Sequence, residues 1–330
     1  MIIKDLPLCS KSEKSYANGR HLGSIPCARA GEIMVHDHFL VFIDDTGNVL
    51  SIKEKKQYGL GFCAFPSSIA NDLHSDLNSA FPRGIHMKNL RKRKSQISAN
   101  LTQLLSKYPD VLAGSYIETN TQYVDHVIAD SLLKSADKFP KKMIEYISKA
   151  ELNPLGFISS SHDAMGDIPK FARLSHFVAA ALRLPLLCIA KTFDVQDRKI
   201  SVDLFIPNCG HPDNFARELE GSYAKAISNF KKSFPTLLEA LKIPPFDVHI
   251  ESYLVKPTIF MDVADTFAMA GQKTAEAIVM NSPSAPELFL SVLPILRRSQ
   301  YGVIPGMLIS KGGDAFANRD IDEIINRWSI

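Results

Sequence analysis

An uninterrupted apolar run at residues 39–43, followed at once by Asp44 and Asp45, is the feature that most constrains the fold of this chain. A strand that is apolar at every position is buried on both faces, which favours the interior of a sheet covered by helices. Gly47 and Asn48 then supply residues typical of a turn. The sequence therefore predicts a central strand whose C-terminal end presents carboxylates.

The rest of the chain alternates between strand and helix patterns. Further strands are expected at residues 58–65, 111–117, 186–193, 199–206 and 246–253, and helices at 69–80, 90–108, 123–133, 140–150, 168–184, 212–232, 236–241 and from 257 onward. The first two strands should pair as an antiparallel hairpin, in which Gly59 and Gly61 permit close backbone approach. An early hairpin followed by alternating elements predicts an α/β fold, a mixed sheet flanked by helices.

Three segments differ in composition along the 330 residues. Residues 1–36 are rich in Ser, Gly, Lys and Arg and are expected to form an irregular arm. Residues 37–281 are expected to form the main domain, with a helical insertion around 120–185. Residues 282–330 are expected to form a helical C-terminal extension. With 45% apolar residues the chain can bury a full core.

The composition indicates which partners and which cellular compartment to expect for this protein. The formal net charge is only +3, so any contact with nucleic acid must come from local patches. The five cysteines show no zinc-ligand spacing, which favours a reducing environment. No stretch reaches the roughly 18 apolar residues that a membrane helix needs. These observations predict a cytoplasmic protein without membrane contact.

Four carboxylates are candidates for chemistry. Asp44 ends the apolar strand, Asp203 lies on a later strand, and Asp262 and Asp265 lie three apart on one helix face. Gathered together, with Asp45 as a further ligand, they would supply the oxygen ligands that Mg²⁺ or Mn²⁺ prefers. The alternatives are a turn cap at Asp44, an edge acid at Asp203, and exposed acids near the positive end of the helix dipole.

The helix that carries Asp262 and Asp265 also has small residues along it. Ala264, Ala268 and Gly271 would let this helix approach the sheet closely. The sequence therefore predicts that its backbone packs near the strands, which would bring its acids toward the sheet.

A cluster of cations precedes the expected helix at residues 90–108. It consists of Lys88, Arg91, Lys92, Arg93 and Lys94. Such a run can neutralise phosphates, and it comes closely after His86. The alternative is that these residues form the solvated face of the helix, and both can be true of one helix.

Three short segments resemble the domain of unknown function 3800 family. Residues 42–48 (Phe-Ile-Asp-Asp-Thr-Gly-Asn) resemble its opening Ile-Asp-Glu-Ser-Gly-Asn strand, residues 85–87 its Glu-Ile-His-Phe segment, and residues 260–268 its closing Leu-Gln-x-Ala-Asp-Leu-x-Ala helix. Their order and separations agree over residues 38–280. The resemblance implies a ribonuclease H-like fold, Asp44 and Asp265 in the acidic positions, and His86 as a proton shuttle or a neighbour of the metal.

Some positions depart from that family. Gly84 stands where the family usually has an acid, and Asp262 replaces its Gln, which would restore an acid nearby. Asp203 would occupy the position of the family's second-strand Asp.

The sequence therefore predicts a metal-dependent nuclease that acts on DNA or RNA. Since several members of that family are encoded near phage-defence genes or mobile elements, the resemblance implies a role of this kind. One alternative is a catalytically degenerate module that binds nucleic acid. Another is a subunit that docks on a protein partner through apolar residues of its tail: Leu288, Leu290, Val292, Leu293 and Leu296.

Overall fold

The structure is a computed structural model of the chain. It describes residues 38–45, 58–85, 94–118, 182–207 without 194 and 197, 227–299 without 229, 306–311, 314–315, 326 and 328. The expected arm at 1–36 and most of the expected insertion at 120–185 lie outside these ranges, so both stay predictions.

Within these ranges seven strands form one mixed sheet. They are β1 His38–Asp45, β2 Tyr58–Pro66, β3 Leu112–Glu118, β4 Lys199–Pro207, β5 Asp247–Val255, β6 Met307–Lys311 and β7 Asp314–Ala315. Their order across the sheet is β5-β4-β1-β2-β3-β6-β7. β1, β2 and β3 are antiparallel neighbours, whereas β4 is parallel to β1, β5 to β4, and β6 to β3. The predicted α/β class and the hairpin of β1 and β2 are confirmed.

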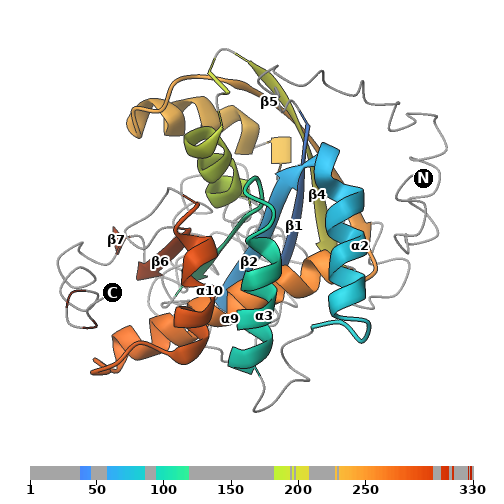
Figure 1. Ribbon diagram of the computed structural model, residues 1–330. Coiled ribbons are helices and arrows are strands. Elements are labelled where there is room, and N and C mark those ends of the chain that lie inside the picture. Colours follow the sequence, from blue (N-terminus) through green and yellow to red (C-terminus); the bar gives the residue numbers. More distant parts are fainter. Residues whose placement is uncertain are drawn as a thin grey trace, which may run out of the picture.

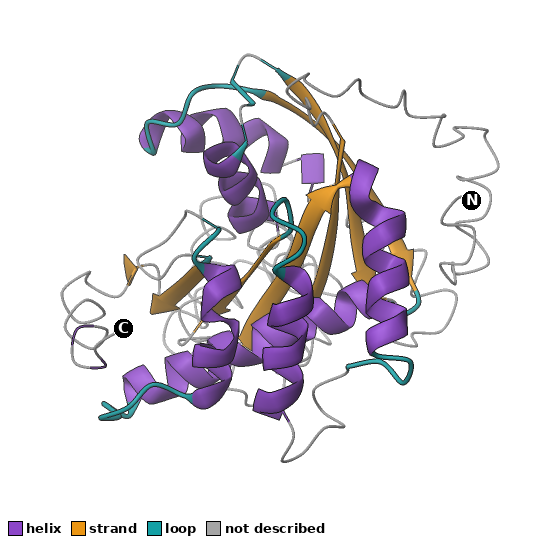
Figure 2. Ribbon diagram, viewed as in Figure 1, coloured by secondary structure: helices purple, strands orange, loops and turns teal. Residues whose placement is uncertain are grey.

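Helices pack on both faces of this sheet (Figures 1 and 2). The labelled helices are α2 Ala70–Ala80, preceded by the single turn η1 Ser67–Ile69, α3 Lys94–Leu105, α9 Ile259–Val279 and α10 Glu287–Leu296. Residues 182–192 and 230–240 are also helical. None of the helices in the described part of the chain is long and apolar enough to cross a membrane.

Alternation along β1 separates two cores. Val41 and Ile43 belong to one core, which also contains helical residues from 182–192 and 230–240. Leu40 and Phe42 belong to the other, which α2, α3, α9 and α10 cover. The apolar run is therefore buried on both faces, as the sequence predicts.

One expected strand is wrong, and one region expected to be helical also contains strands. Residues 186–193, expected as a strand, continue a helix that includes residues 182–192. Leu and Ala are good helix formers, and a short apolar run has no period that separates a buried helix from a buried strand. The expected helical extension at 282–330 is helical at α10, but β6 then joins the sheet beside β3. The tail is thus part of the fold.

Within α10, the apolar residues that the sequence suggested as a partner surface are mostly buried. Leu288, Val292 and Leu296 are buried in the core with α3 and α9, and Leu293 packs against it. Leu290 alone of the five has a largely exposed side chain, at 46%. Side chains that already fill a core cannot dock on another protein without unfolding it.

A hydrogen bond between α2 and the turn after α3 gives a pH-dependent contribution to stability. The Tyr108 hydroxyl donates to Asp76 Oδ2 at 2.9 Å. Desolvation by burial, this hydrogen bond and the charges of Asp76 and Asp72 raise the pKa of Tyr108 from 10.0 to about 12. The folded state thus prefers the neutral phenol, and this contribution to stability is present below pH 10 and lost as the pH rises through about 12. We expect urea unfolding to show a steeper loss of stability over this range than in Tyr108→Phe; equal slopes would contradict it.

Candidate active site

The N-terminal half of α9 packs against β1 and β2. The Thr258 side chain caps the helix by accepting a hydrogen bond from the Met261 N–H at 3.4 Å. The Phe260 ring then lies 4.7 Å from the ring of Phe42 and 4.9 Å from that of Phe65. This aromatic contact fixes the helix at the C-terminal half of β1, beside Asp44.

Gly61 allows α9 to approach the sheet closely. A Cβ at Gly61 would overlap the backbone carbonyl of Ala264 and lie 2.7 Å from the Ala268 nitrogen. The predicted close approach of this helix is therefore confirmed, and it requires small residues on both sides of the contact. Because Gly61 is the register partner of Asp44, the helix backbone lies one strand away from Asp44.

Asp44 and Asp265 lie on the same face and at the same end of the sheet. Asp44 comes two residues after Phe42, so its side chain points to the face that α9 covers. Asp265 comes directly after Ala264, the residue that rests on Gly61. The Asp44 side chain is partly exposed, whereas Asp265 is fully buried. A buried carboxylate in an apolar core is costly, which makes Asp265 unusual for a purely structural position.

Asp262 lies one helical turn before Asp265 and contacts the loop after α2. Its Oδ2 accepts a hydrogen bond from the Ile85 N–H at 3.0 Å. A Cβ at Gly84 would lie 2.8 Å from the same oxygen. The helix thus brings a carboxylate to the place where a side chain at residue 84 would begin.

The cationic cluster is described only at Lys94, the first residue of α3. The Lys94 Nζ lies 3.1 Å from the sulfur of Met269, which is one turn beyond Asp265 on α9. His86, Lys88, Arg91, Lys92 and Arg93 lie outside the described residues. Ile85 and Lys94, which flank them, both contact α9. Figure 1 shows the end of α2 and the start of α3 at the edge of the sheet that α9 crosses.

Asp203 does not join this group. It pairs in register with Leu40, four residues before Asp44 on β1, which corresponds to roughly 13 Å along the strand. Its Oδ2 lies 3.1 Å from His38 Nε2 instead. The side chains of Glu251, His249 and Tyr253 form a separate hydrogen-bonded group on β5, where Glu251 is the register partner of Asp203. The expectation that Asp203 shares a cation with Asp44 is wrong.

The donor set suits an ion that keeps most of its water. Within the described ranges, no three His, Cys, Asp or Glu side chains are grouped closely enough to enclose a metal ion. Mg²⁺ is commonly held by one or two carboxylates together with water and substrate phosphates. Asp44 and Asp265 fit that requirement, and Asp45 belongs to the same end of β1.

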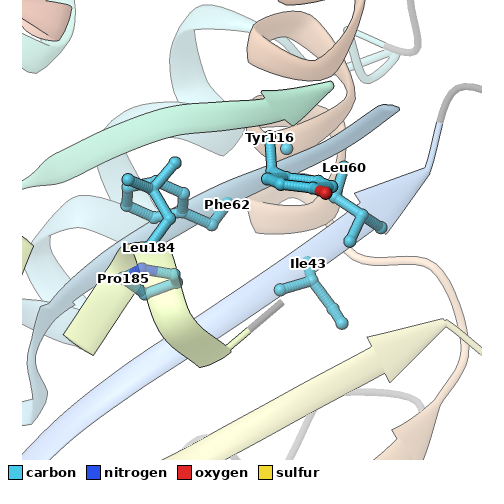
Figure 3. Close-up of a pocket in the computed structure, with 7 residues that line it drawn as sticks. Ile43, Leu60, Phe62, Tyr116, Leu184 and Pro185 are labelled. Atoms are coloured by element: carbon cyan, nitrogen blue, oxygen red, sulfur yellow. The ribbon is translucent and has the colours of Figure 1, made fainter. Parts of the chain in front are cut away.

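The opposite face of the sheet is apolar at the same position. Figure 3 shows a recess whose lining includes Ile43, Leu60, Phe62, Tyr116, Leu184 and Pro185. It offers one hydroxyl and no charged group.

The two cysteines that the structure describes are buried. Burial raises the pKa of the thiols of Cys63 and Cys188 well above the usual value, so neither is a nucleophile at neutral pH.

The link between Asp262 and Ile85 was not anticipated from the sequence. A usable signal was present: residues 82–84 (Pro-Arg-Gly) indicate a turn, and Gly84 has a φ of +71°, where glycine is favoured. The turn alone, however, does not reveal which distant carboxylate would cap it.

Comparisons with known proteins add no family assignment. No family model matches the chain, and no curated protein matches it.

Proposed function

We propose that this protein is a metal-dependent nuclease with a ribonuclease H-like fold, in which Asp44 and Asp265 hold Mg²⁺ or Mn²⁺ and cations near Lys94 hold the nucleic acid. The observation that carries the proposal is that Asp44 ends β1 on the face that α9 covers, while Asp265 follows Ala264, which packs on Gly61, the register partner of Asp44. The resemblance to the domain of unknown function 3800 family points the same way.

The strand order supports the ribonuclease H-like part of the proposal. Three antiparallel strands, β1 to β3, are extended beside β1 by the parallel strands β4 and β5. This order, with a first strand that carries an acid at the centre, is typical of ribonuclease H-like sheets. A helix bearing a second acid then packs over the first strand, which suits a shared cation.

The chain's own groups have distinct tasks in this proposal. Asp44, partly exposed, can reach a ligand from the solvent side, whereas Asp265 is held rigidly by the packing of α9 on Gly61. In this proposal the Lys94 ammonium attracts a phosphate, since the Met269 sulfur that it contacts is only a weak acceptor. A bound divalent cation would offset phosphate charge and make water a better nucleophile. His86 would carry a proton, as the family resemblance implies.

Cleavage assays on single-stranded and double-stranded DNA, RNA and an RNA–DNA hybrid test this proposal. We expect cleavage with Mg²⁺ or Mn²⁺, none with a chelator, and recovery when the metal is restored. Binding of the same strands in chelator should weaken steeply as salt increases, because phosphate contacts release counterions. Cleavage that persists in chelator, or no cleavage of any substrate with either metal, would overturn the nuclease proposal.

A degenerate module that binds nucleic acid is the second candidate, and the position of Asp203 favours it. One of the four expected carboxylates is engaged with His38 away from the site, which leaves fewer ligands for a metal. This candidate predicts salt-dependent binding of the labelled strands without turnover under any metal condition.

A further inference from the structure

The first observation is a hydrogen bond between residues far apart in the sequence. The Ile85 N–H donates to Asp262 Oδ2 at 3.0 Å, and the Ile85 side chain is fully buried in the core that α9 covers. A backbone N–H bound to an ionised carboxylate is a charge-assisted hydrogen bond, stronger than one between neutral groups. Asp262 also lies in the first turn of α9, where the helix dipole favours negative charge.

The second observation is that the Asp262 carboxylate lies close to Gly84, where the side chain of any other residue would begin. The Gly84 N–H donates to the Phe81 carbonyl at 2.9 Å, which closes a turn after α2. Gly84 has a φ of +71°, and a Cβ there would lie 2.8 Å from Asp262 Oδ2. The backbone conformation therefore favours glycine, and a Cβ would require the Asp262 carboxylate to shift.

The third observation concerns the stretch of chain immediately C-terminal to Ile85. His86 is the next residue, and the cationic cluster of Lys88, Arg91, Lys92, Arg93 and Lys94 comes directly after it. At the other end of this stretch, Lys94 contacts Met269, seven residues beyond Asp262 on α9. Ile85 and Lys94 thus both contact α9.

We infer that Asp262 is a positioning residue, which fixes Ile85 and the turn at Gly84 through the Ile85 N–H, and is not a ligand of the cation. From the sequence alone, Asp262 was predicted to be a metal ligand. The inference rests on the proposed function for its nucleic-acid and metal readouts, whereas its amide-exchange readout does not.

The test compares Asp262→Asn with Asp262→Ala. Asparagine keeps a carbonyl oxygen that can accept from Ile85, and alanine does not. Losing a hydrogen bond to a charged acceptor should speed hydrogen exchange of the Ile85 amide by about tenfold or more in Asp262→Ala. The same variant should bind a labelled single strand several-fold more weakly. Asp262→Asn should stay within about twofold of the wild type in both measurements, and calorimetric titration should give both variants the Mn²⁺ affinity of the wild type.

Glu276→Ala is the matched control, because it removes one acid from the same helix. Glu276 pairs with Lys273 on the surface, away from Ile85. It should leave the Ile85 exchange rate unchanged, so a general effect of charge on α9 can be recognised.

Two results would overturn the inference. Asp262→Asn could lose Mn²⁺ affinity as strongly as Asp262→Ala, which would make Asp262 a ligand. Alternatively, Ile85 exchange could be equal in the wild type and in Asp262→Ala, which would show that the hydrogen bond fixes nothing. If the wild type itself neither binds Mn²⁺ nor cleaves nucleic acid, the proposed function fails, while the exchange result still decides whether Asp262 fixes Ile85.

Gly84→Ala provides an independent variant in which Asp262 is intact. The added Cβ should displace the carboxylate, so this variant should show the faster Ile85 exchange and weaker strand binding of Asp262→Ala. Wild-type behaviour of Gly84→Ala in both measurements would contradict the inference.

Discussion

Replacing Asp265 with asparagine is expected to lower metal-dependent cleavage on the order of 10³-fold while the chain stays folded. The change removes one negative charge from a fully buried side chain without changing its shape. If that charge holds a cation, asparagine leaves the cation with too little compensation. Asp44→Asn should have a comparable effect, because in the proposed site the two carboxylates hold the same ion.

Stability measurements separate this effect from unfolding. A buried carboxylate is costly to desolvate, so Asp265→Asn should keep the free energy of unfolding within about 1 kcal/mol of the wild type, or raise it. Chelated protein should be compared in urea unfolding, so that metal binding does not contribute. Lost activity with retained stability is the signature of a residue kept for function.

Asp203→Asn is the matched control for both variants. It makes the same chemical change at a carboxylate that the sequence had also selected, but which pairs with His38. Its cleavage rate should stay within about threefold of the wild type. Equal losses in Asp203→Asn and Asp265→Asn would mean that the convergence of Asp44 and Asp265 has no special role.

Replacing Gly61 with alanine is expected to destabilise the fold by roughly 4 kcal/mol or more, an exceptional cost for one methyl group. The added Cβ would overlap the Ala264 carbonyl and lie 2.7 Å from the Ala268 nitrogen. These are backbone atoms in the middle of a helix, so relief requires the whole of α9 to move. Such a movement would also separate Asp265 from Asp44.

Gly271→Ala calibrates this prediction on the same helix. A Cβ at Gly271 would meet Ser115 Oγ and Ile117 Cδ1, which can shift by rotation, and would lie 2.9 Å from Ser115 Cβ, which moves only with β3. We expect a cost of about 1–3 kcal/mol, as in ordinary overpacking. Urea unfolding of both variants measures the difference; a Gly61→Ala protein as stable as Gly271→Ala would show that α9 is not held against β2.

Much of the sheet was predictable because its signals are local. The apolar run of β1, the alternating apolar residues of β4 and the apolar stripe of α9 are each visible within a short stretch of sequence. The strand or helix that each pattern predicts is confirmed. The close packing of α9 was also predictable, since Gly61 and the small residues of the helix are visible in the sequence. Alternation along β1 places Asp44 on the face that this helix covers.

The errors at Asp203 and in residues 307–311 share one cause: local sequence patterns do not show strand register or long-range pairing. Asp203 lies on the expected strand, but the pairing of β4 with β1 puts it opposite Leu40 rather than beside Asp44. A shift of four residues in that register would have brought the two acids together. Likewise, nothing within residues 307–311 reveals that this segment pairs with β3.

The pairing of β6 with β3 has a consequence for the order of synthesis on the ribosome. β3 ends at Glu118, but its parallel neighbour begins at Met307. Until translation has passed β6, the nascent polypeptide carries a strand whose free edge can recruit strands from other chains. A premature stop codon after α10 would leave that edge permanently uncovered, and the truncated product should aggregate even though every carboxylate of the proposed site is present.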